Sequence, residues 1–391
     1  MDHFKYLIIG GGMTADAAVQ GIRSVDPVGS ICIMSAETDP PYNRPPLSKA
    51  LWKGETVDSI WRKTQDQKVT LLLGRTVTRI DAKEKRIVDS GTSSYSWEKL
   101  LLATGCSPRR LPFDDKQIIY FRTFADYRHL RTLAEEQKRF AVIGGGFIGS
   151  EMAAALNLYA KEVVMVFPGE GICDRVFPKE LSEFVTDFYR KKGVQVVSKA
   201  KLSGLETKDG SFVLKAGNKG DIFVDAVVAG VGVEPNVELA KALGLKVDNG
   251  IVVDEFLRTG QADIYAAGDV ASFFNQSLGK RIRVEHEDNA NTMGRQAGRN
   301  MAGQPEPYNH LPSFYSDLFE LGYEAVGELD SRLRTVVDWK EPYKEGVVYY
   351  LENNRVRGVL LWNVWGKVDV ARALIAESKP VREEELKGRL H

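Results

Sequence analysis

The chain has 391 residues, enough for two or three domains that each bury a sizeable core. Apolar residues make up 43% and charged residues 27%, as in folded globular proteins, which argues against a disordered or fibrous chain. Basic and acidic residues number 53 each, so the zero net charge gives no reason to expect a nucleic acid or an anionic membrane as partner.

The cysteines predict neither disulfides nor thiol chemistry. Cys32, Cys106 and Cys173 stand far apart and form no C-x-x-C pair. No apolar run approaches the ~20 residues of a membrane span, and the N-terminus shows no signal-peptide pattern. We therefore expect a cytoplasmic protein without a membrane partner or a metal site.

The chain begins with the pattern of a strand, a glycine turn, a helix and a second strand. Residues 6–9 are apolar and lead into Gly-Gly-Gly at 10–12. A helix pattern of small residues follows at 14–22, and residues 30–34 are apolar again. This order predicts a βαβ unit.

The same pattern returns about a third of the chain later. Strand signals fill the interval, at 69–73, 86–88 and 100–103. The second copy has a strand at 140–143, glycines at 144–146, a helix at 147–159 and a strand at 163–167. Two copies of one unit suggest two nucleotide sites.

Further strand signals follow the second βαβ unit, and a stretch of different character begins near residue 310. Strand signals lie at 194–197, 212–214, 226–228, 335–339, 347–351 and 356–362. Asn353-Asn354 separates the last two, and asparagine tolerates the positive φ of a tight hairpin turn. With a helix pattern at 368–377, these signals predict a third, α+β domain.

The glycine loops carry the strongest functional signal. The second is a full G-x-G-x-x-G, and the first has alanine in the third place. The first glycine makes the turn, the second admits a pyrophosphate, and the third lets helix and strand pack closely. Each loop is followed after about 20 residues by an acid that suits a ribose hydroxyl. The residues are Gly10, Gly12 and Ala15 with Glu37, and Gly144, Gly146 and Gly149 with Glu170.

A third signal is an apolar strand that ends in Asp269, within residues 259–269. Ligands of open α/β folds lie at this end of the strands, where an aspartate can accept hydrogen bonds from sugar-type hydroxyls. The alternative is an N-cap for a following helix. The two glycine loops and the Ala-Thr-Gly at 103–105 favour the first interpretation.

The chain resembles the flavoprotein reductases with two dinucleotide-binding domains, in the branch of ferredoxin and rubredoxin reductases and apoptosis-inducing factor. The resemblance rests on PPYNRPPLSKALW (40–52), LLATG (101–105), VIGGGFIGSEMAAAL (142–156), GVGVEPNVELAK (230–241), IYAAGDV (264–270) and RVEHEDNA (283–290). The tail is most similar to the apoptosis-inducing-factor type, through FYSDLFELGYEAVG (314–327) and GVLLWNVWGKVDVAR (358–372).

The resemblance implies an α/β fold with an NAD domain inserted into an FAD domain, and a C-terminal α+β domain that covers the flavin. The expected bounds are 1–115 with 244–309 for the FAD domain, 116–243 for the NAD(P) domain, and 310–391 for the third.

The resemblance also implies the cofactor-binding residues. The FAD site would comprise Gly10, Gly12, Met13, Thr14, Ala15, Glu37, Arg44, Lys49, Val77, Ala103, Thr104, Gly105, Arg122, Gly268, Asp269, His286 and Tyr315. The NAD site would comprise Gly144, Gly145, Gly146, Phe147, Ile148, Gly149, Glu151, Glu170, Gly232 and Glu285. The chain departs from the family at Ala36, where the family acid often stands, and at Tyr315, where the apoptosis-inducing-factor type has tryptophan.

The expected reaction is hydride transfer from NADH to FAD, which needs two stacked rings and little water. Lys49 is the candidate cation beside the flavin, with Glu151 as its partner. Phe147 would lie over the flavin and move when the nicotinamide enters, although a core aromatic is the alternative. Glu285 would accept from the carboxamide. Residues 167–172 contain no basic residue, so NAD(H) is favoured over NADP(H).

Two functions fit this site nearly equally. The first is a reductase that passes electrons from FAD to a small iron–sulfur protein of the ferredoxin or rubredoxin type. The second is a redox sensor of the apoptosis-inducing-factor type, whose charge-transfer complex with NADH controls dimerisation to a homodimer and partner binding. A cysteine-based oxidase or disulfide reductase is not expected, because the stretch 45–51 has Ser48 and no cysteine. The intact loops also speak against a binding module that has lost its flavin.

Overall fold

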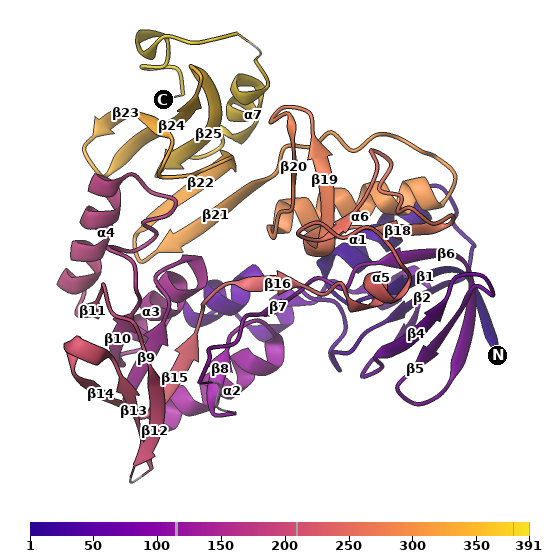
Figure 1. Ribbon diagram of the computed structural model, residues 1–391, viewed down its shortest axis with the longest axis horizontal. Helices are drawn as coiled ribbons and strands as arrows, with labels where there is room; N and C mark the ends of the chain where they lie inside the picture. Colours follow the sequence, from indigo (N-terminus) through magenta and orange to yellow (C-terminus); the bar gives the residue numbers. More distant parts are fainter. Residues whose placement is uncertain (114–115, 209, 378, 391) are drawn as a thin grey trace. The chain divides into compact units, whose positions relative to one another are not determined.

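The computed structural model describes residues 1–113, 116–208, 210–377 and 379–390. The expected domain boundary at residue 115 and the last residue of the chain, 391, lie outside the described residues. The chain forms two compact units (Figure 1). The first unit comprises residues 1–44, 57–107 and 234–312, and the second unit comprises residues 45–56, 108–233 and 313–391. The three-domain division expected from the sequence stays a prediction.

The first unit is built on a seven-stranded sheet in the order β3-β2-β1-β6-β5-β4, with β18 paired to β6. Strands β1, β2, β3, β6 and β18 run parallel, and β4 and β5 extend the sheet as an antiparallel edge. The strands are β1 Asp2–Ile9, β2 Ile31–Met34, β3 Thr70–Leu72, β4 Val77–Asp81, β5 Arg86–Asp89, β6 Ser94–Leu102 and β18 Ile264–Ala266. A smaller sheet contains β17 Ile251–Val252, β19 Ala271–Asn275 and β20 Lys280–Ile282. The helices are α1 Met13–Arg23, α5 Glu238–Ala242 and α6 Glu287–Met301.

Helices α1 and α6 pack at very short range because their facing residues are small. A Cβ added to Gly298 would lie 2.1 Å from the carbonyl oxygen of Ala18, and one added to Gly21 would lie 2.1 Å from that of Arg295. Contact with α6 therefore fixes the position of the α1 backbone. Since α1 begins directly after the first glycine loop, this contact also supports the loop.

The second unit contains a five-stranded parallel sheet in the order β11-β10-β9-β15-β8. Its strands are β8 Ile118–Tyr120, β9 Arg139–Ile143, β10 Glu162–Val166, β11 Gln195–Val197 and β15 Ala226–Ala229, and its helices are α2 Phe124–Glu136, α3 Phe147–Leu158 and α4 Lys179–Lys191. An antiparallel sheet is formed by β12 Gly204–Lys208, β13 Ser211–Lys215 and β14 Asp221–Val224. The chain changes unit at five points, and two of them lie within short strands, β7 Cys106–Pro108 and β16 Val233–Pro235.

The C-terminal part of the second unit is a five-stranded antiparallel sheet in the order β21-β22-β25-β24-β23. It comprises β21 Ser313–Leu318, β22 Leu321–Gly327, β23 Arg334–Glu341, β24 Glu345–Glu352 and β25 Arg355–Trp362, followed by helix α7 Val368–Ala376. Asn353 and Asn354 join β24 to β25 with φ of +50° and +58°, as the hairpin prediction requires.

The structure confirms the predicted fold class, an α/β protein with a β-rich C-terminal part. Both βαβ patterns form, as β1-α1-β2 and β9-α3-β10. The predicted element bounds agree to within a few residues, except that β6 begins at Ser94, six residues before the predicted run. Within the described part of the chain, no helix has both the length and the apolar composition needed to cross a membrane.

The α1–α6 contact generates a stability prediction. Gly298→Ala should lower the free energy of unfolding by about 1–3 kcal/mol, because the new methyl group must push two helix backbones apart. Gly260→Ala is the matched control, since no atom lies within 4 Å of its added Cβ, and its effect should stay within about 0.5 kcal/mol. Urea unfolding of both variants tests this, and equal midpoints would contradict the role of the close contact.

Candidate functional site

Both glycine loops begin with a turn that only glycine fits. Gly10 and Gly144 have φ of +117° and +122°, a backbone region that side chains rarely adopt. A Cβ would lie 2.0 Å from the carbonyl oxygen of Ala103 at the first turn and 2.2 Å from that of Gly230 at the second. In each sheet the loop therefore crosses directly over the end of a neighbouring strand.

The second glycine of each G-x-G motif, Gly12 or Gly146, faces open space. A Cβ at Gly146 would meet no atom within 4 Å, and one at Gly12 would meet only the Arg44 guanidinium at 3.9 Å. These glycines are the N-caps of α3 and α1, and neither helix has a side-chain cap. No side chain therefore competes for the N–H groups at the start of either helix, so both loops suit a dinucleotide pyrophosphate.

In the first unit, the segment after β2 brings two predicted residues together, Glu37 and Arg44. Glu37 forms an ion pair with Arg44 and accepts a hydrogen bond of 2.6 Å from the Tyr42 hydroxyl. The same hydroxyl accepts from Arg44 at 3.1 Å. Since Arg44 also lies nearest to Gly12, a cation and a carboxylate flank the open side of the first loop.

Two further turns complete this end of the first sheet. The side chain of Thr104 donates to the carbonyl of Asn236 at 2.8 Å, and the Asn236 amide donates back to the carbonyl of Thr104 at 2.8 Å. At Gly268, with φ +77°, a Cβ would lie 2.2 Å from the hydroxyl of Thr14. The Ala-Thr-Gly turn and the turn that carries Asp269 therefore have fixed positions, and the second lies against the first turn of α1.

Arg283 links several residues expected at the cofactor. Its guanidinium forms an ion pair of 2.7 Å with Glu285 and donates to the carbonyl of Asp269 at 3.2 Å. It also donates to the sulfur of Cys106 at 3.2 Å. The Arg283 side chain is 7% exposed, so one buried cation sets the position of the Glu285 carboxylate and supports the Asp269 turn.

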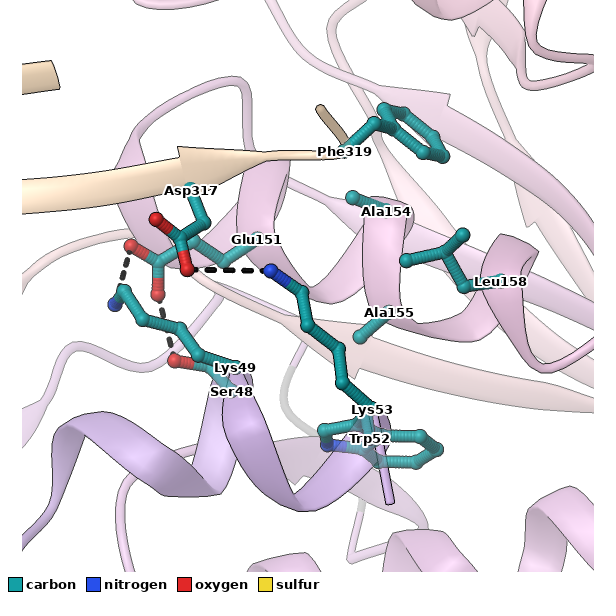
Figure 2. Close-up of a pocket in the computed structure, with 10 residues that line it drawn as sticks. All are labelled: Ser48, Lys49, Trp52, Lys53, Glu151, Ala154, Ala155, Leu158, Asp317 and Phe319. Carbon is teal, nitrogen blue, oxygen red and sulfur yellow. Dashed lines mark hydrogen bonds and ion pairs between the residues drawn. The ribbon is translucent and has the colours of Figure 1, made fainter. Parts of the chain in front are cut away.

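In the second unit, the carboxylate of Glu151 is the centre of a buried polar cluster (Figure 2). The ammonium of Lys49 lies 2.7 Å from one carboxylate oxygen, which also accepts 2.6 Å from the Ser316 hydroxyl. The other oxygen accepts 2.6 Å from the Ser48 hydroxyl. Lys49 is 9% and Glu151 4% exposed, so both charges depend on this arrangement for the stabilisation that water would otherwise supply.

The loop that carries Lys49 is anchored by Trp52. The Trp52 indole donates to the carbonyl of Leu47 at 2.8 Å. Its ring packs edge-on against Tyr127 and Tyr159, and the Arg131 guanidinium lies 5.0 Å from its centre. These contacts explain why residues 45–56 belong to the second unit although both flanking segments belong to the first.

A cavity of about 10 Å³ lies beside the Lys49–Glu151 pair. This volume holds at most about one water molecule. The lining residues come from the Lys49 loop, from α3, and from β21 with the residue that follows it (Figure 2). They are Ser48, Lys49, Trp52, Lys53, Glu151, Ala154, Ala155, Leu158, Asp317 and Phe319.

Two aromatic residues of β21 lie close to predicted site residues. The ring of Phe147, at the start of α3, lies 5.1 Å from that of Phe314. The ammonium of Lys49 lies 5.3 Å from the ring centre of Tyr315, which is 42% exposed. Phe147 therefore rests on another ring on one side, and Tyr315 leaves an aromatic face accessible beside the cation.

The acid of the second loop, Glu170, is exposed and forms an ion pair of 2.9 Å with Lys199. Lys199 follows β11, the neighbour of β10 in the sheet. Lys199 lies outside residues 167–172, the segment whose lack of a basic residue favoured NAD(H), so the sequence did not predict this contact.

Comparison with known proteins identifies the family. Residues 4–296 match the family described as Pyridine nucleotide-disulphide oxidoreductase, and residues 297–341 and 337–377 match the C-terminal domain of mitochondrion-associated apoptosis-inducing factor. The chain belongs to the pyridine nucleotide-disulphide oxidoreductase family.

Both groups that the sequence suggested are found among the relatives of this chain. The chain is 33% identical to apoptosis-inducing factor 1 of Dictyostelium discoideum, over 98% of this chain and 80% of that protein. It is also 33% identical to the ferredoxin–NAD(+) reductase component of the anthranilate 1,2-dioxygenase system of Burkholderia cepacia, over 95% and 94%. Among solved structures, the covalent putidaredoxin reductase–putidaredoxin complex matches with a TM-score of 0.90 at 30% identity, over 98% of this chain and 95% of that one.

Membership of the pyridine nucleotide-disulphide oxidoreductase family makes the protein an FAD-dependent NAD(P)H oxidoreductase with FAD and NAD(H) as cofactors. The flavin, when bound, supplies the hydride and electron chemistry. Burial raises the pKa of the Cys32 and Cys173 thiols to about 12, so neither is a thiolate at neutral pH.

The predicted site residues of this family member divide between the units. The first unit holds Gly10, Gly12, Met13, Thr14, Ala15, Glu37, Arg44, Val77, Ala103, Thr104, Gly105, Gly268, Asp269, Glu285 and His286. The second holds Lys49, Arg122, Gly144, Gly145, Gly146, Phe147, Ile148, Gly149, Glu151, Glu170, Gly232 and Tyr315. The cofactor contacts of these residues stay predictions.

Sequence reasoning missed the residues that hold the predicted ones in place. Some of these residues lie inside the quoted motifs, but the sequence assigned them no role. Lys199 and Arg131 lie outside the motifs. The missed residues are Ser48, Trp52, Asn236, Arg283 and Ser316 within the motifs, and Arg131 and Lys199 outside.

The charge state of His286 gives a pH prediction. Burial lowers the pKa of this ring to about 4 from its ordinary 6.5, and the charges of Asp269 and Asp288 raise it only in part. Because the folded pKa is depressed, the contribution of His286 to stability is complete above pH 6.5 and is lost as the pH falls towards 4.

Unfolding by urea at several pH values measures this loss. The fall in stability between pH 6.5 and pH 4 should be smaller in His286→Gln than in the unmodified chain, because glutamine cannot take up the proton. A proton NMR titration of the five histidines provides the direct check. A His286 signal that titrates at its ordinary pKa would contradict the assignment.

Proposed function

We propose that the protein binds FAD at the Gly10–Ala15 loop and NADH at the Gly144–Gly149 loop, and that it passes the electrons on to a small iron–sulfur protein of the ferredoxin or rubredoxin type. The observation that carries the proposal is the buried pair of Lys49 and Glu151, because it supplies a fixed cation in a nearly dry site. Relatives named as ferredoxin and putidaredoxin reductases support the choice of acceptor.

Lys49 is proposed to stabilise negative charge that arrives on the flavin. A buried ammonium acts strongly because little water screens it. Glu151 holds this ammonium in place, and Ser48 and Ser316 hold Glu151. Phe147 is proposed to cover the ring and to move aside for the nicotinamide.

A substitution at Lys49 tests this role. Lys49→Ala should slow anaerobic reduction of the flavin by NADH on the order of 10²-fold, while the FAD content of the purified protein stays close to normal. Lys53→Ala is the matched control. This lysine lies on the same loop but is 43% exposed and pairs with Asp317 at 3.2 Å, so its loss should leave the rate nearly unchanged. Stopped-flow absorbance measures both rates, and an unchanged rate in Lys49→Ala refutes the assignment.

A second candidate function is an NADH-dependent redox sensor that changes its dimerisation and its partners. The C-terminal match to apoptosis-inducing factor favours it, as do relatives of that name that cover nearly the whole chain. In this case NADH would form a long-lived charge-transfer complex with the flavin. The homodimer and the cytoplasmic location stay predictions in both cases.

One anaerobic experiment separates the two functions. NADH is added to the holoprotein, the flavin absorbance is followed in time, and a [2Fe–2S] ferredoxin or a rubredoxin is then added. Fast bleaching with prompt reoxidation by the iron–sulfur protein supports the reductase. Slow bleaching, a persistent long-wavelength band and a change in molecular mass by light scattering support the sensor and contradict the reductase.

A further inference from the structure

The turns that follow β10 and β11 are joined by their backbones. The N–H of Lys199 donates to the carbonyl of Gly169 at 2.8 Å, and the N–H of Ala200 donates to the carbonyl of Phe167 at 3.0 Å. Phe167 in turn donates to Val197 at 3.3 Å. Lys199 adopts φ of +55°, a conformation that these bonds hold in place. Its Cα is therefore fixed beside the turn that carries Glu170.

The side chains of the two turns meet in an exposed ion pair. The Lys199 ammonium lies 2.9 Å from the Glu170 carboxylate, and the backbone N–H of Glu170 is held by Asp174 at 2.8 Å. The hydrogen bond and the charge of Lys199, with a smaller contribution from the charge of Lys179, lower the pKa of Glu170. Exposed pairs of this kind are weak, so a ligand can open this one at little cost.

The end of the second strand of a βαβ nucleotide site generally faces the ribose 2′-position of the nucleotide. In a βαβ nucleotide site, the acid after the second strand accepts hydrogen bonds from the ribose 2′-hydroxyl, and a 2′-phosphate needs a cation there instead. Here the second strand is β10; Glu170 follows it, and Lys199, which follows the neighbouring strand β11, pairs with Glu170. A carboxylate alone would repel a phosphate, whereas a carboxylate neutralised by a lysine repels it much less.

We propose that Lys199 forms a subsite for the 2′-phosphate of NADPH that Glu170 occupies in the unliganded protein. The pair, and not Glu170 alone, then sets the preference between the two nicotinamide nucleotides. The inference rests on the proposed binding of the nucleotide at the Gly144–Gly149 loop. NADH is favoured because Glu170 accepts from the ribose. NADPH keeps measurable access because Lys199 can turn from the carboxylate to the phosphate.

Binding of the oxidised nucleotides to the holoprotein tests the subsite without any electron transfer. Calorimetry gives the Kd of NADP⁺ and NAD⁺ for the unmodified protein, Glu170→Gln, Lys199→Gln, Lys199→Arg and the double variant Glu170→Gln/Lys199→Gln. Lys201→Gln is the control for loss of a lysine charge on the same exposed stretch.

We expect Glu170→Gln to tighten NADP⁺ binding at least tenfold and to weaken NAD⁺ binding severalfold. Adding Lys199→Gln should abolish the gain for NADP⁺. Lys199→Gln alone should weaken NADP⁺ and leave NAD⁺ within about twofold, while Lys199→Arg and Lys201→Gln should behave like the unmodified protein. The gain should also shrink as salt is added, because it comes from an exposed charge.

Two results would overturn the inference in distinguishable ways. Equal NADP⁺ affinities in Glu170→Gln and in the double variant, together with weakened NAD⁺ binding, would exclude Lys199 and leave the nucleotide site intact. Unchanged affinities for both nucleotides in Glu170→Gln would refute the inference together with the proposed placement of the nucleotide. Normal flavin content and circular dichroism of each variant show that the fold is retained.

Discussion

The close approach of backbone to backbone at two strand ends is the constraint on which the nucleotide-binding parts of this protein depend. At Gly10 and Gly144 a carbonyl oxygen of a neighbouring strand occupies the space that a side chain would need. The chain can turn there only with positive φ, and a helix starts three residues later. No side chain caps either helix, so the N–H groups at the helix start can donate to an anionic pyrophosphate. One steric constraint thus produces the turn and the helix start in each unit, where the sequence predicts that a pyrophosphate binds.

A second constraint operates in the interior of the second unit. The Glu151 carboxylate is nearly inaccessible to water, and a buried charge is tolerated only when it is fully partnered. Its partners come from two other parts of the chain, Ser48 and Lys49 from the loop after Arg44 and Ser316 from β21. The charge therefore joins α3, that loop and the C-terminal sheet in a single geometry. A cation placed in this way can act on a cofactor without first reorganising its surroundings.

Buried and exposed ion pairs have different uses in this protein. The Arg283–Glu285 and Lys49–Glu151 pairs each contain a buried cation, so they fix positions. The Glu170–Lys199 pair is open to water, so its charges are screened and its side chains can be rearranged by a ligand. On the proposed function, the reaction itself would depend on the buried pairs. The choice between NADH and NADPH would depend on the exposed Glu170–Lys199 pair.

The amino-acid sequence by itself determined the features that arise within short stretches of chain. The alternation of apolar runs and glycines predicted both βαβ units, and the asparagine pair predicted the β24–β25 hairpin. Phosphate binding at the two glycine loops stays a prediction. The quoted motifs led further, to the family and to the pair of Lys49 and Glu151, which the structure does bring together.

Only the tertiary structure decided which side chains support these residues. Ser48 and Ser316 stand 103 and 165 residues from the carboxylate that they hold, and Lys199 reaches Glu170 from a different strand of the sheet. A serine or an exposed lysine has no distinctive pattern, because such residues are common on every surface. Their contacts result from strand order and helix packing. Since these depend on residues far apart in the sequence, no short stretch of sequence predicts them.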